Sequence, residues 1–192
     1  MDKAEPFAEI DQALLAASSN EVSRRFIAAW LGWRGAARLL PKRADIDIAD
    51  IKELLDRVIL VELGGPDGLR VKVAGSRLRN HIDFEATGKN LAAITPPGDW
   101  PLRRWRITEM ATRPCAGVSI LRDRRRRDGI TVEMVTLPLE PDAPGKPPLT
   151  LSNIAVCGGV YEPPPKDRPL LWPAVEEFRF LDLGAGVPEK AA

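Results

Sequence analysis

The sequence predicts an α+β domain in which five antiparallel strands form one sheet, helices cover one face of the sheet, and a helical extension precedes it. Three observations support this prediction. Apolar residues recur at helical spacing over residues 7–34. Alternating or β-branched apolar runs begin at residue 58 and return in the last third of the chain. A second helical pattern separates these two groups of strands, which is an order typical of α+β domains.

The N-terminal extension is expected to contain two helices. The first is indicated by four apolar residues at helical spacing, Phe7, Ile10, Leu14 and Leu15. The second begins after Asn20, whose side-chain oxygen can accept a hydrogen bond from a free N–H of the first turn, and Gly35 can end it. The apolar face of this second helix is formed by Val22, Phe26, Trp30 and Trp33.

A short helix is predicted over residues 48–55. Pro41 stops the preceding helix, and Asp45 and Asp47 stand just before the new one. An Asp at such a position caps free N–H groups and complements the helix dipole. The two carboxylates could also bind a metal ion, but capping explains them more simply.

Residues 58–73 are expected to form a β-hairpin with one solvent-exposed face. The first strand, 58–63, is apolar and β-branched, and in the second the apolar residues alternate with Arg70 and Lys72. The intervening residues, 64–68, contain three glycines, a proline and an aspartate. Such a run is a strong turn signal, and the chain has no phosphate-binding glycine motif, so we interpret it as a hairpin loop.

The helix that should cover the sheet is predicted from Trp100 to about Thr112. It follows a mixed segment over residues 75–91. Asp99 can cap it, and Pro101 suits its first turn, where the missing N–H costs nothing.

The last third of the chain is strand-like. Three strands are predicted over residues 116–121, 130–139 and 149–157. An arginine-rich connector with Arg124 to Arg127 and a proline-rich loop join them. Residues 175–183 are expected to add a short C-terminal element.

Composition excludes several classes of protein. The net charge of the 192 residues is only +1, so no global field favours nucleic acid or an acidic membrane surface. No secretory signal and no membrane-spanning apolar run is visible, and we expect a cytoplasmic protein that binds neither nucleic acid nor membrane. The two cysteines, Cys115 and Cys157, lack metal-site spacing, and we expect both to be reduced and buried.

Several motifs follow one another along the chain in a fixed order. They are Pro41-Lys42-Arg43-Ala44-Asp45-Ile46-Asp47, Gly75-Ser76-Arg77-Leu78, Thr87-Gly88-Lys89-Asn90-Leu91, Arg113-Pro114-Cys115-Ala116-Gly117 and Leu137-Pro138-Leu139. Together they resemble one family, the PAS-like proteins common in alphaproteobacteria that were first catalogued as a domain of unknown function. The resemblance covers roughly residues 22–160, although Ile48 and Asp56 stand where the family often has proline. It implies a PAS fold with an N-terminal helical extension (1–40), the domain proper (41–160) and a proline-rich tail (161–192).

The resemblance further implies a sensory or regulatory protein. Such domains commonly bind a small ligand in the hollow of the sheet, or pair with other proteins through the sheet and an N-terminal helix. The sequence names no cofactor. Binding candidates on the sheet are Val118, Ile120, Val132, Met134 and Asn153, to which Arg77, Trp105 and His81 (a potential haem ligand) are added.

Partner contacts have their own candidates. Phe26, Trp30 and Trp33 on the second helix are either core residues or the interface of a homodimer, and a signalling protein is a further partner class. The arginine run is interpreted as a solvated loop, with contact to an anionic partner as the alternative.

Two rival functions stay open. One is a ligand-free structural or interaction module with a filled core. The other is an enzyme of unrecognised class, for which Ser76, His81 and Asp83 are near one another in sequence only. We therefore expect a regulatory protein that is not an enzyme.

Overall fold

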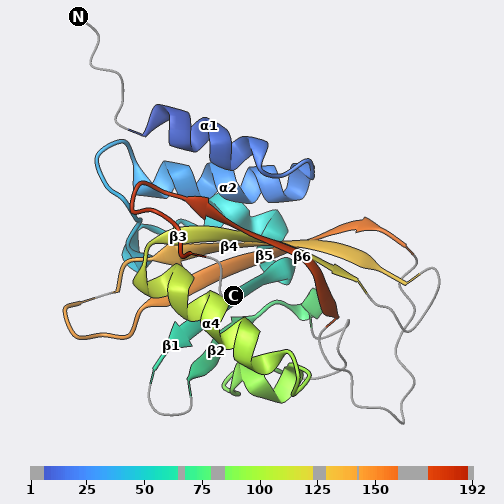
Figure 1. Cartoon of the computed structure of the whole chain (residues 1–192). Coiled ribbons are helices and arrows are strands. Elements are labelled where there is room, and N and C mark those ends of the chain that lie inside the picture. Colours follow the sequence, from blue (N-terminus) through green and yellow to red (C-terminus); the bar gives the residue numbers. More distant parts are fainter. Residues whose placement is uncertain are drawn as a thin grey trace, which may run out of the picture.

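Antiparallel strands form the centre of the molecule, and helices lie on both sides of them (Figure 1). The computed structural model of the chain describes residues 7–64, 68–78, 85–122, 129–141, 143–159 and 173–189. The described strands form one sheet in the order β2-β1-β5-β4-β3-β6, and every neighbouring pair is antiparallel. The strands are β1 (Val58–Leu63), β2 (Leu69–Ala74), β3 (Cys115–Arg122), β4 (Thr131–Leu139), β5 (Leu149–Gly158) and β6 (Ala174–Asp182).

The α+β class and the antiparallel sheet are confirmed, but the sheet has a sixth strand. β6 pairs with β3 along its whole length. It lies in the segment expected to be a proline-rich tail with one short element. Its burial is low because it is an edge strand, and a half-exposed edge strand leaves only a weak hydrophobic signal in a sequence.

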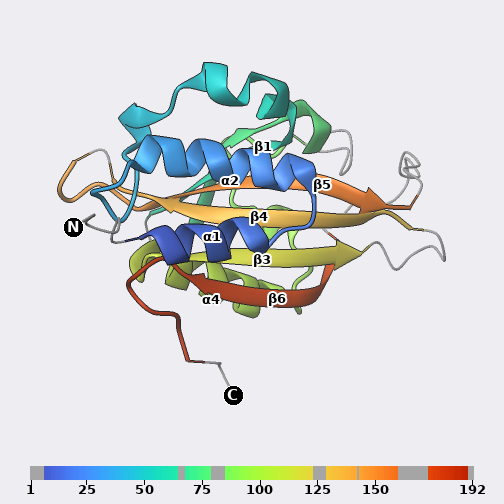
Figure 2. The same ribbon diagram turned by 90° about the horizontal axis from the view of Figure 1, so that it is seen from above.

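The N-terminal extension forms the two expected helices, α1 (Ala8–Ala16) and α2 (Glu21–Arg34). The predicted cap of α2 is confirmed, since Asn20 Oδ1 accepts a hydrogen bond from Val22 N at 2.9 Å. Gly35 ends the helix with a φ of 66°, a conformation that favours glycine. Seen from above, both helices lie over the strands and run roughly along them (Figure 2).

An ion pair at the C-terminal end of α2 holds α1 and α2 together. Arg34 on α2 is 2% exposed and donates to Asp11 Oδ2 on α1 at 2.7 Å. Its guanidinium also lies 4.8 Å from the ring centre of Phe7, a cation–π contact. The extension therefore behaves as a tied pair of helices rather than as two independent ones.

The segment after Pro41 is helical, but as 3₁₀ turns rather than an α-helix. Its pieces are η1 (Arg43–Asp45) and η2 (Ile48–Arg57). Both aspartates act as caps: Asp45 Oδ2 accepts from Lys42 N at 2.7 Å, and Asp47 Oδ1 accepts from Ala49 N at 2.8 Å. A hydrogen bond from Arg38, followed by that from Lys42 N, lowers the pKa of Asp45.

The second helical layer consists of η3 (Leu91–Ile94) and α4 (Trp100–Thr112). Pro101 occupies the first turn of α4 as expected. The expectation that the Asp99 side chain caps α4 is wrong, because Asp99 already has helical backbone angles whereas a capping residue is normally extended.

The sheet has two covered faces, which we name after the elements that lie on them. The extension face packs against α1, α2 and η2, and the α4 face packs against η3 and α4. One-sided cover by helices was expected, and the N-terminal extension supplies the second side. Buried residues of the extension-face core include Leu14, Phe26, Ile27, Trp30, Leu54, Val118, Val135, Leu137 and Leu151, and those of the α4-face core include Ile59, Val71, Leu91, Ile107, Met110, Val132, Met134 and Ile154.

The three aromatic residues considered for a dimer interface belong to the extension-face core instead. Phe26 and Trp30 are fully buried, and Trp33 is 7% exposed. Trp30 Nε1 donates to Pro138 O at 3.0 Å, and Trp33 Nε1 donates to Asp50 Oδ2 at 2.8 Å. The apolar side of α2 is thus covered by its own chain. It leaves these three side chains no exposed surface for a second chain.

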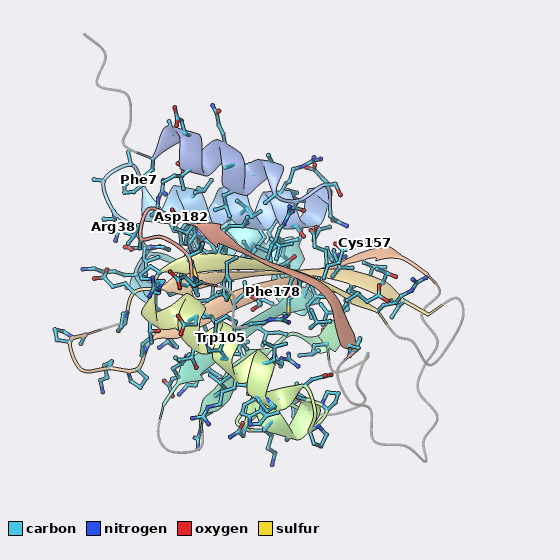
Figure 3. The ribbon with its side chains drawn as sticks, in the orientation of Figure 1. Phe7, Arg38, Trp105, Cys157, Phe178 and Asp182 are labelled. Carbon is cyan, nitrogen blue, oxygen red and sulfur yellow. The ribbon has the colours of Figure 1, made fainter. Side chains whose placement is uncertain are left out.

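The cysteines differ from each other. Cys115 is buried as expected, whereas Cys157 is exposed near the end of β5 (Figure 3). The prediction for Cys157 is wrong because β5 runs past the part of the sheet that the helices cover, so its last residues face solvent. Within the described residues, no helix has the length and apolar character needed to span a bilayer.

Candidate functional site

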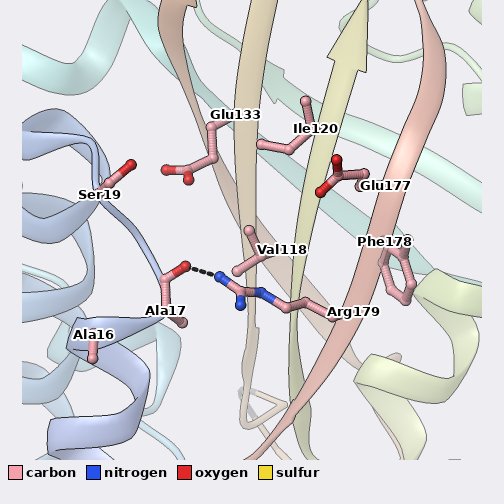
Figure 4. A pocket seen from close by; sticks show the side chains of 9 residues that line it. All are labelled: Ala16, Ala17, Ser19, Val118, Ile120, Glu133, Glu177, Phe178 and Arg179. Carbon is pink, nitrogen blue, oxygen red and sulfur yellow. Dashed lines mark hydrogen bonds between the residues drawn. The ribbon is translucent and has the colours of Figure 1, made fainter.

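A cleft of about 350 Å³ lies on the extension face, between the end of α1 and strands β3, β4 and β6 (Figure 4). Its volume falls within the range of small-molecule sites. The cleft combines apolar and charged side chains, and it lies at a junction of elements that are far apart in the sequence. The residues that line it are Ala16, Ala17, Ser19, Val118, Ile120, Glu133, Glu177, Phe178 and Arg179.

Strand register brings the charged residues of the cleft together. Ile120 on β3 is the partner of Glu133 on β4 and of Glu177 on β6, so these three residues form one row across the sheet. In the next row, Val118 pairs with Arg179. Because residues in register share a face, the floor is made of Val118 and Ile120, with charged groups on both sides of it.

Glu133 supplies the inner wall of the cleft. Glu133 is only 4% exposed, and Ser18 Oγ donates a hydrogen bond to Glu133 Oε1 at 2.5 Å. No Lys or Arg of the described residues forms an ion pair with it. A buried carboxylate whose neighbour is a neutral hydroxyl is costly unless a cation or further donors approach it.

The outer wall comes from β6. Glu177 and Arg179 are both exposed, two residues apart on the same face of the strand. Arg179 Nη2 donates to the backbone oxygen of Ala17, at the end of α1 (Figure 4). Arg179 therefore ties the edge strand to the extension across the mouth of the cleft.

The link between α1 and α2, residues 17–20, carries most of the polar contacts with the sheet. Beside the contacts of Ala17 and Ser18, Asn20 Nδ2 donates to Val156 O on β5 at 3.2 Å. The link thus touches β4, β5 and β6 through hydrogen bonds, whereas α1 and α2 pack on the sheet through apolar side chains, to which Trp30 of α2 adds its hydrogen bond to Pro138 O.

Asn153 was expected to supply a polar contact to a ligand, but it is not among the residues that line the cleft. It is fully buried on the extension face, opposite Val58 and Val135. Among the described residues neither atom of its amide has a hydrogen-bond partner, and the same holds for the buried hydroxyl of Ser23. The extension face therefore carries buried polar groups at Asn153 and Glu133, on adjacent strands.

The four apolar residues expected to form one pocket are divided between the two faces. Val118 and Ile120 line the cleft, whereas Val132 and Met134 pack in the α4-face core. The pairing of Val118 with Val135 places even-numbered residues of β3 on the same face as odd-numbered residues of β4. The expectation of one pocket is wrong because register across the connector decides which residues share a face.

The remaining binding candidates are scattered. Arg77 is at the surface, where its Nε donates to Asp56 Oδ2 at 2.9 Å. Trp105 projects from α4 against the edge strand, with its ring 5.5 Å from that of Phe180 (Figure 3). His81 lies outside the described residues, as do Asp83 and the arginine run.

A smaller pocket of about 70 Å³ lies under the start of α4. Arg103, which lines it, is buried and donates to Thr95 Oγ1 at 3.0 Å. Burial lowers the pKa of Arg103 to about 9, so the side chain is still protonated at neutral pH. A space of this size holds one or two water molecules rather than an organic ligand. Of the described residues, no group of three or more His, Cys, Asp or Glu is placed to hold a metal ion.

Sequence reasoning missed Ser18, Glu133, Glu177 and Arg179. Glu133 alternates with Val132 and Met134, which suggests a solvent-facing position on a half-buried strand. The available signal was the length of the predicted α1 and α2, since two amphipathic helices before a sheet need a face on which to bury their apolar sides. A charged residue on that face then becomes buried.

Solved structures of LOV proteins have a low similarity to this chain. No curated protein matches the chain. A structure of RsLOV carrying one substitution aligns with a TM-score of 0.41 and 16% identity over 56% of this chain and 66% of that chain, slightly less than two thirds. The LOV protein of Rhodobacter sphaeroides aligns with a TM-score of 0.40 and 14% identity over 59% of this chain and 69% of its own.

The family comparison covers more of the chain. The family model described as a PAS domain matches residues 18–154, from the link between α1 and α2 to the middle of β5. The match includes β1 to β4 in full, both helical layers except α1, and the buried Glu133. The resemblance inferred from the motifs is thereby confirmed, and this chain belongs to the PAS domain family.

Proposed function

We propose that this chain is a sensory or regulatory PAS module in which the N-terminal extension is the element that responds. A small ligand in the cleft, or a protein bound at its rim, changes how the extension sits on the sheet. A partner protein or a second copy of the chain then reads that change, and the module itself carries out no chemical reaction.

One observation carries this proposal: the link between the two helices is hydrogen-bonded to a buried carboxylate at the wall of an open cleft. Any group that enters the cleft and competes for Glu133 acts directly on Ser18. Because α1 and α2 are tied by Arg34 and Asp11, a displacement of the link moves both helices together.

The burial pattern gives a second argument. Within the described residues, Asn153 and Ser23 have unpaired polar atoms and Glu133 has one hydroxyl partner, all three in an otherwise apolar interface. Such groups lower the stability of the docked state. An interface that is stabilised by apolar contacts and weakened by polar ones is suited to a small free-energy difference between two arrangements, which is what a ligand needs in order to shift a population.

The proposal is tested by hydrogen exchange followed by mass spectrometry on the full chain. Ser18→Ala removes the hydroxyl donor to Glu133, a loss of about 1.5–3 kcal/mol for a hydrogen bond to a charged group. We expect faster amide exchange in α1 and the start of α2, with unchanged exchange in β1 and β2. Ser19→Ala is the matched control, since Ser19 is exposed and its hydroxyl forms no hydrogen bond within the described residues.

Equal exchange of the two variants throughout the extension would contradict the proposal. Native mass spectrometry of the purified protein addresses the alternative, a ligand-free interaction module. An additional mass that leaves on denaturation supports the sensory function, and if its removal leaves exchange in the extension unchanged, the interaction module is favoured.

A further inference from the structure

We propose that the cleft binds the ammonium group of a small aliphatic amine, with Glu133 as the counter-charge. This inference names the ligand class for the function proposed above and rests on it. Four features of the cleft lead to it: a buried carboxylate that forms no ion pair with the described residues, the apolar floor, the second carboxylate, and the position of the arginine.

The charge of Glu133 is the starting point. The carboxylate lines the cleft and is almost fully buried, and within the described residues it accepts one side-chain hydrogen bond, from the hydroxyl of Ser18. A buried anion is stabilised most by a cation that brings several N–H donors to it. An ammonium group supplies both the charge and three donors, and it is small enough to reach a carboxylate at the inner wall.

The floor of the cleft suits a short hydrocarbon chain. Ile120 separates Glu133 from Glu177, and the Val118 side chain lies beside it on the same face. Two inter-strand spacings separate the backbones of Glu133 and Glu177, about 9–10 Å. Methylene groups attached to an ammonium group at Glu133 would therefore lie on Ile120 and point toward a second carboxylate.

Arg179 argues against an anionic ligand. Its guanidinium already donates to Ala17 O and lies at the rim beside Glu177. An anion in the cleft would face two carboxylates and have one exposed arginine in its favour. A cation in the cleft would instead be attracted by two carboxylates and repelled by one arginine. The stronger attraction would come from the buried Glu133, because charges are screened less in the interior.

The test measures binding of n-butylamine and diaminobutane to the full chain by isothermal titration calorimetry, with n-butanol as the neutral probe of similar shape. We expect both amines to bind at least tenfold more tightly than n-butanol, and diaminobutane more tightly than n-butylamine because of Glu177. The factor of ten is the lower end of what a charge-assisted hydrogen bond contributes.

Two variants locate the site. Glu133→Gln should weaken amine binding at least tenfold, whereas Glu9→Gln, which removes the same charge from an exposed position on α1, should leave it unchanged. Ala16→Trp fills the mouth of the cleft without altering a buried charge and should abolish binding. It keeps the test decisive if Glu133→Gln does not fold.

The outcomes separate this inference from the proposed function. Amines that bind no better than n-butanol, or that bind equally to Glu133→Gln or Ala16→Trp, overturn the ligand class. The proposed function would then still be tested separately, by hydrogen exchange in the extension of the Ser18→Ala variant. If the amines bind as expected but do not change hydrogen exchange in the extension, the result supports the binding site and contradicts its role in signalling.

Discussion

At the scale of single residues, glycine positions show how closely the backbone of this domain is packed. A Cβ atom on Gly75 would lie 2.4 Å from the carbonyl group of Asp56, a distance that no side chain can accept. Gly75 N also donates to Val58 O at 2.8 Å, so the backbone cannot move away freely. This gives a physical reason for the Gly-Ser-Arg-Leu motif on which the family resemblance partly rested.

Gly75→Ala should therefore destabilise the protein by about 1–3 kcal/mol, the usual cost of overpacking a closed site. Gly32→Ala is the matched control, because nothing lies within 4 Å of that position on α2. It should stabilise the fold by about 0.5–1 kcal/mol, the difference in helix propensity between the two residues. Urea denaturation measures both, and equal effects of the two substitutions would contradict the packing argument.

The two cysteines allow a test of burial and pH dependence. Burial, with a smaller effect of Glu109, raises the pKa of Cys115 to about 12 from its ordinary value of 9.0. Between these values the unfolded chain has lost the thiol proton and the folded chain has kept it. The contribution of Cys115 to stability is thus fully present below pH 9 and falls as the pH rises toward 12.

We expect a thiol reagent at pH 8 to label Cys157 in the native protein and Cys115 only after unfolding. Cys115→Ala should remove part of the loss of stability above pH 9, and Cys157→Ala should not. Rapid labelling of both thiols in the folded protein would show that the interior near Cys115 is open.

At the scale of elements, β6 extends the sheet and connects its two faces. Its Phe178 and Phe180 form an edge-to-face pair at 4.7 Å and lie on the α4 side, where Phe180 meets Trp105 and Phe178 meets Arg106. Arg179, between them, points to the extension face. Because successive side chains of β6 point to opposite faces, this edge strand contacts both α4 and the end of α1.

Phe180→Ala should destabilise the protein by about 2 kcal/mol, less than for a fully buried phenylalanine because Phe180 is half-buried. The loss of the contact should also alter the near-UV circular dichroism of Trp105. Val187→Ala, at an exposed position beyond the strand, is the control and should change stability by less than about 0.5 kcal/mol. If the two variants match, β6 is not part of the cooperative fold.

At the scale of the whole molecule, the extension and the sheet share one apolar core. Trp30 is fully buried between them and donates to Pro138 on β4. Because this core contains residues of α1, α2, η2 and four strands, the extension is expected to unfold together with the sheet, even though we propose that a ligand alters its docking at the link.

Trp30→Ala should cost about 3–5 kcal/mol and leave a single unfolding transition. Ile48→Ala, at a position that is 59% exposed, should cost less than about 0.5 kcal/mol. Differential scanning calorimetry distinguishes the cases. A separate early transition in the wild-type protein would mean that the extension is a domain of its own.

The sequence by itself determined the local structure and the family. Helical spacing, the Asn20 cap, the pairing of β1 with β2 and the strand alternation follow from patterns over short stretches, so they can be recognised without knowing the rest of the fold. The motifs that resemble PAS proteins agree with the family match, since they record the same local constraints, of which Gly75 is an example.

Only the tertiary structure decided which residues form the candidate site. The register between β3 and β4 placed Val118 and Ile120 on one face of the sheet and Val132 and Met134 on the other. The docking of the extension buried Glu133, although its alternation with apolar residues suggests a solvent-exposed position. The register depends on how β3 pairs with β4 across the connector, and the burial of Glu133 depends on a contact with Ser18, 115 residues away in the sequence. A periodic pattern states that a strand has two faces, but it does not state which element will cover each of them.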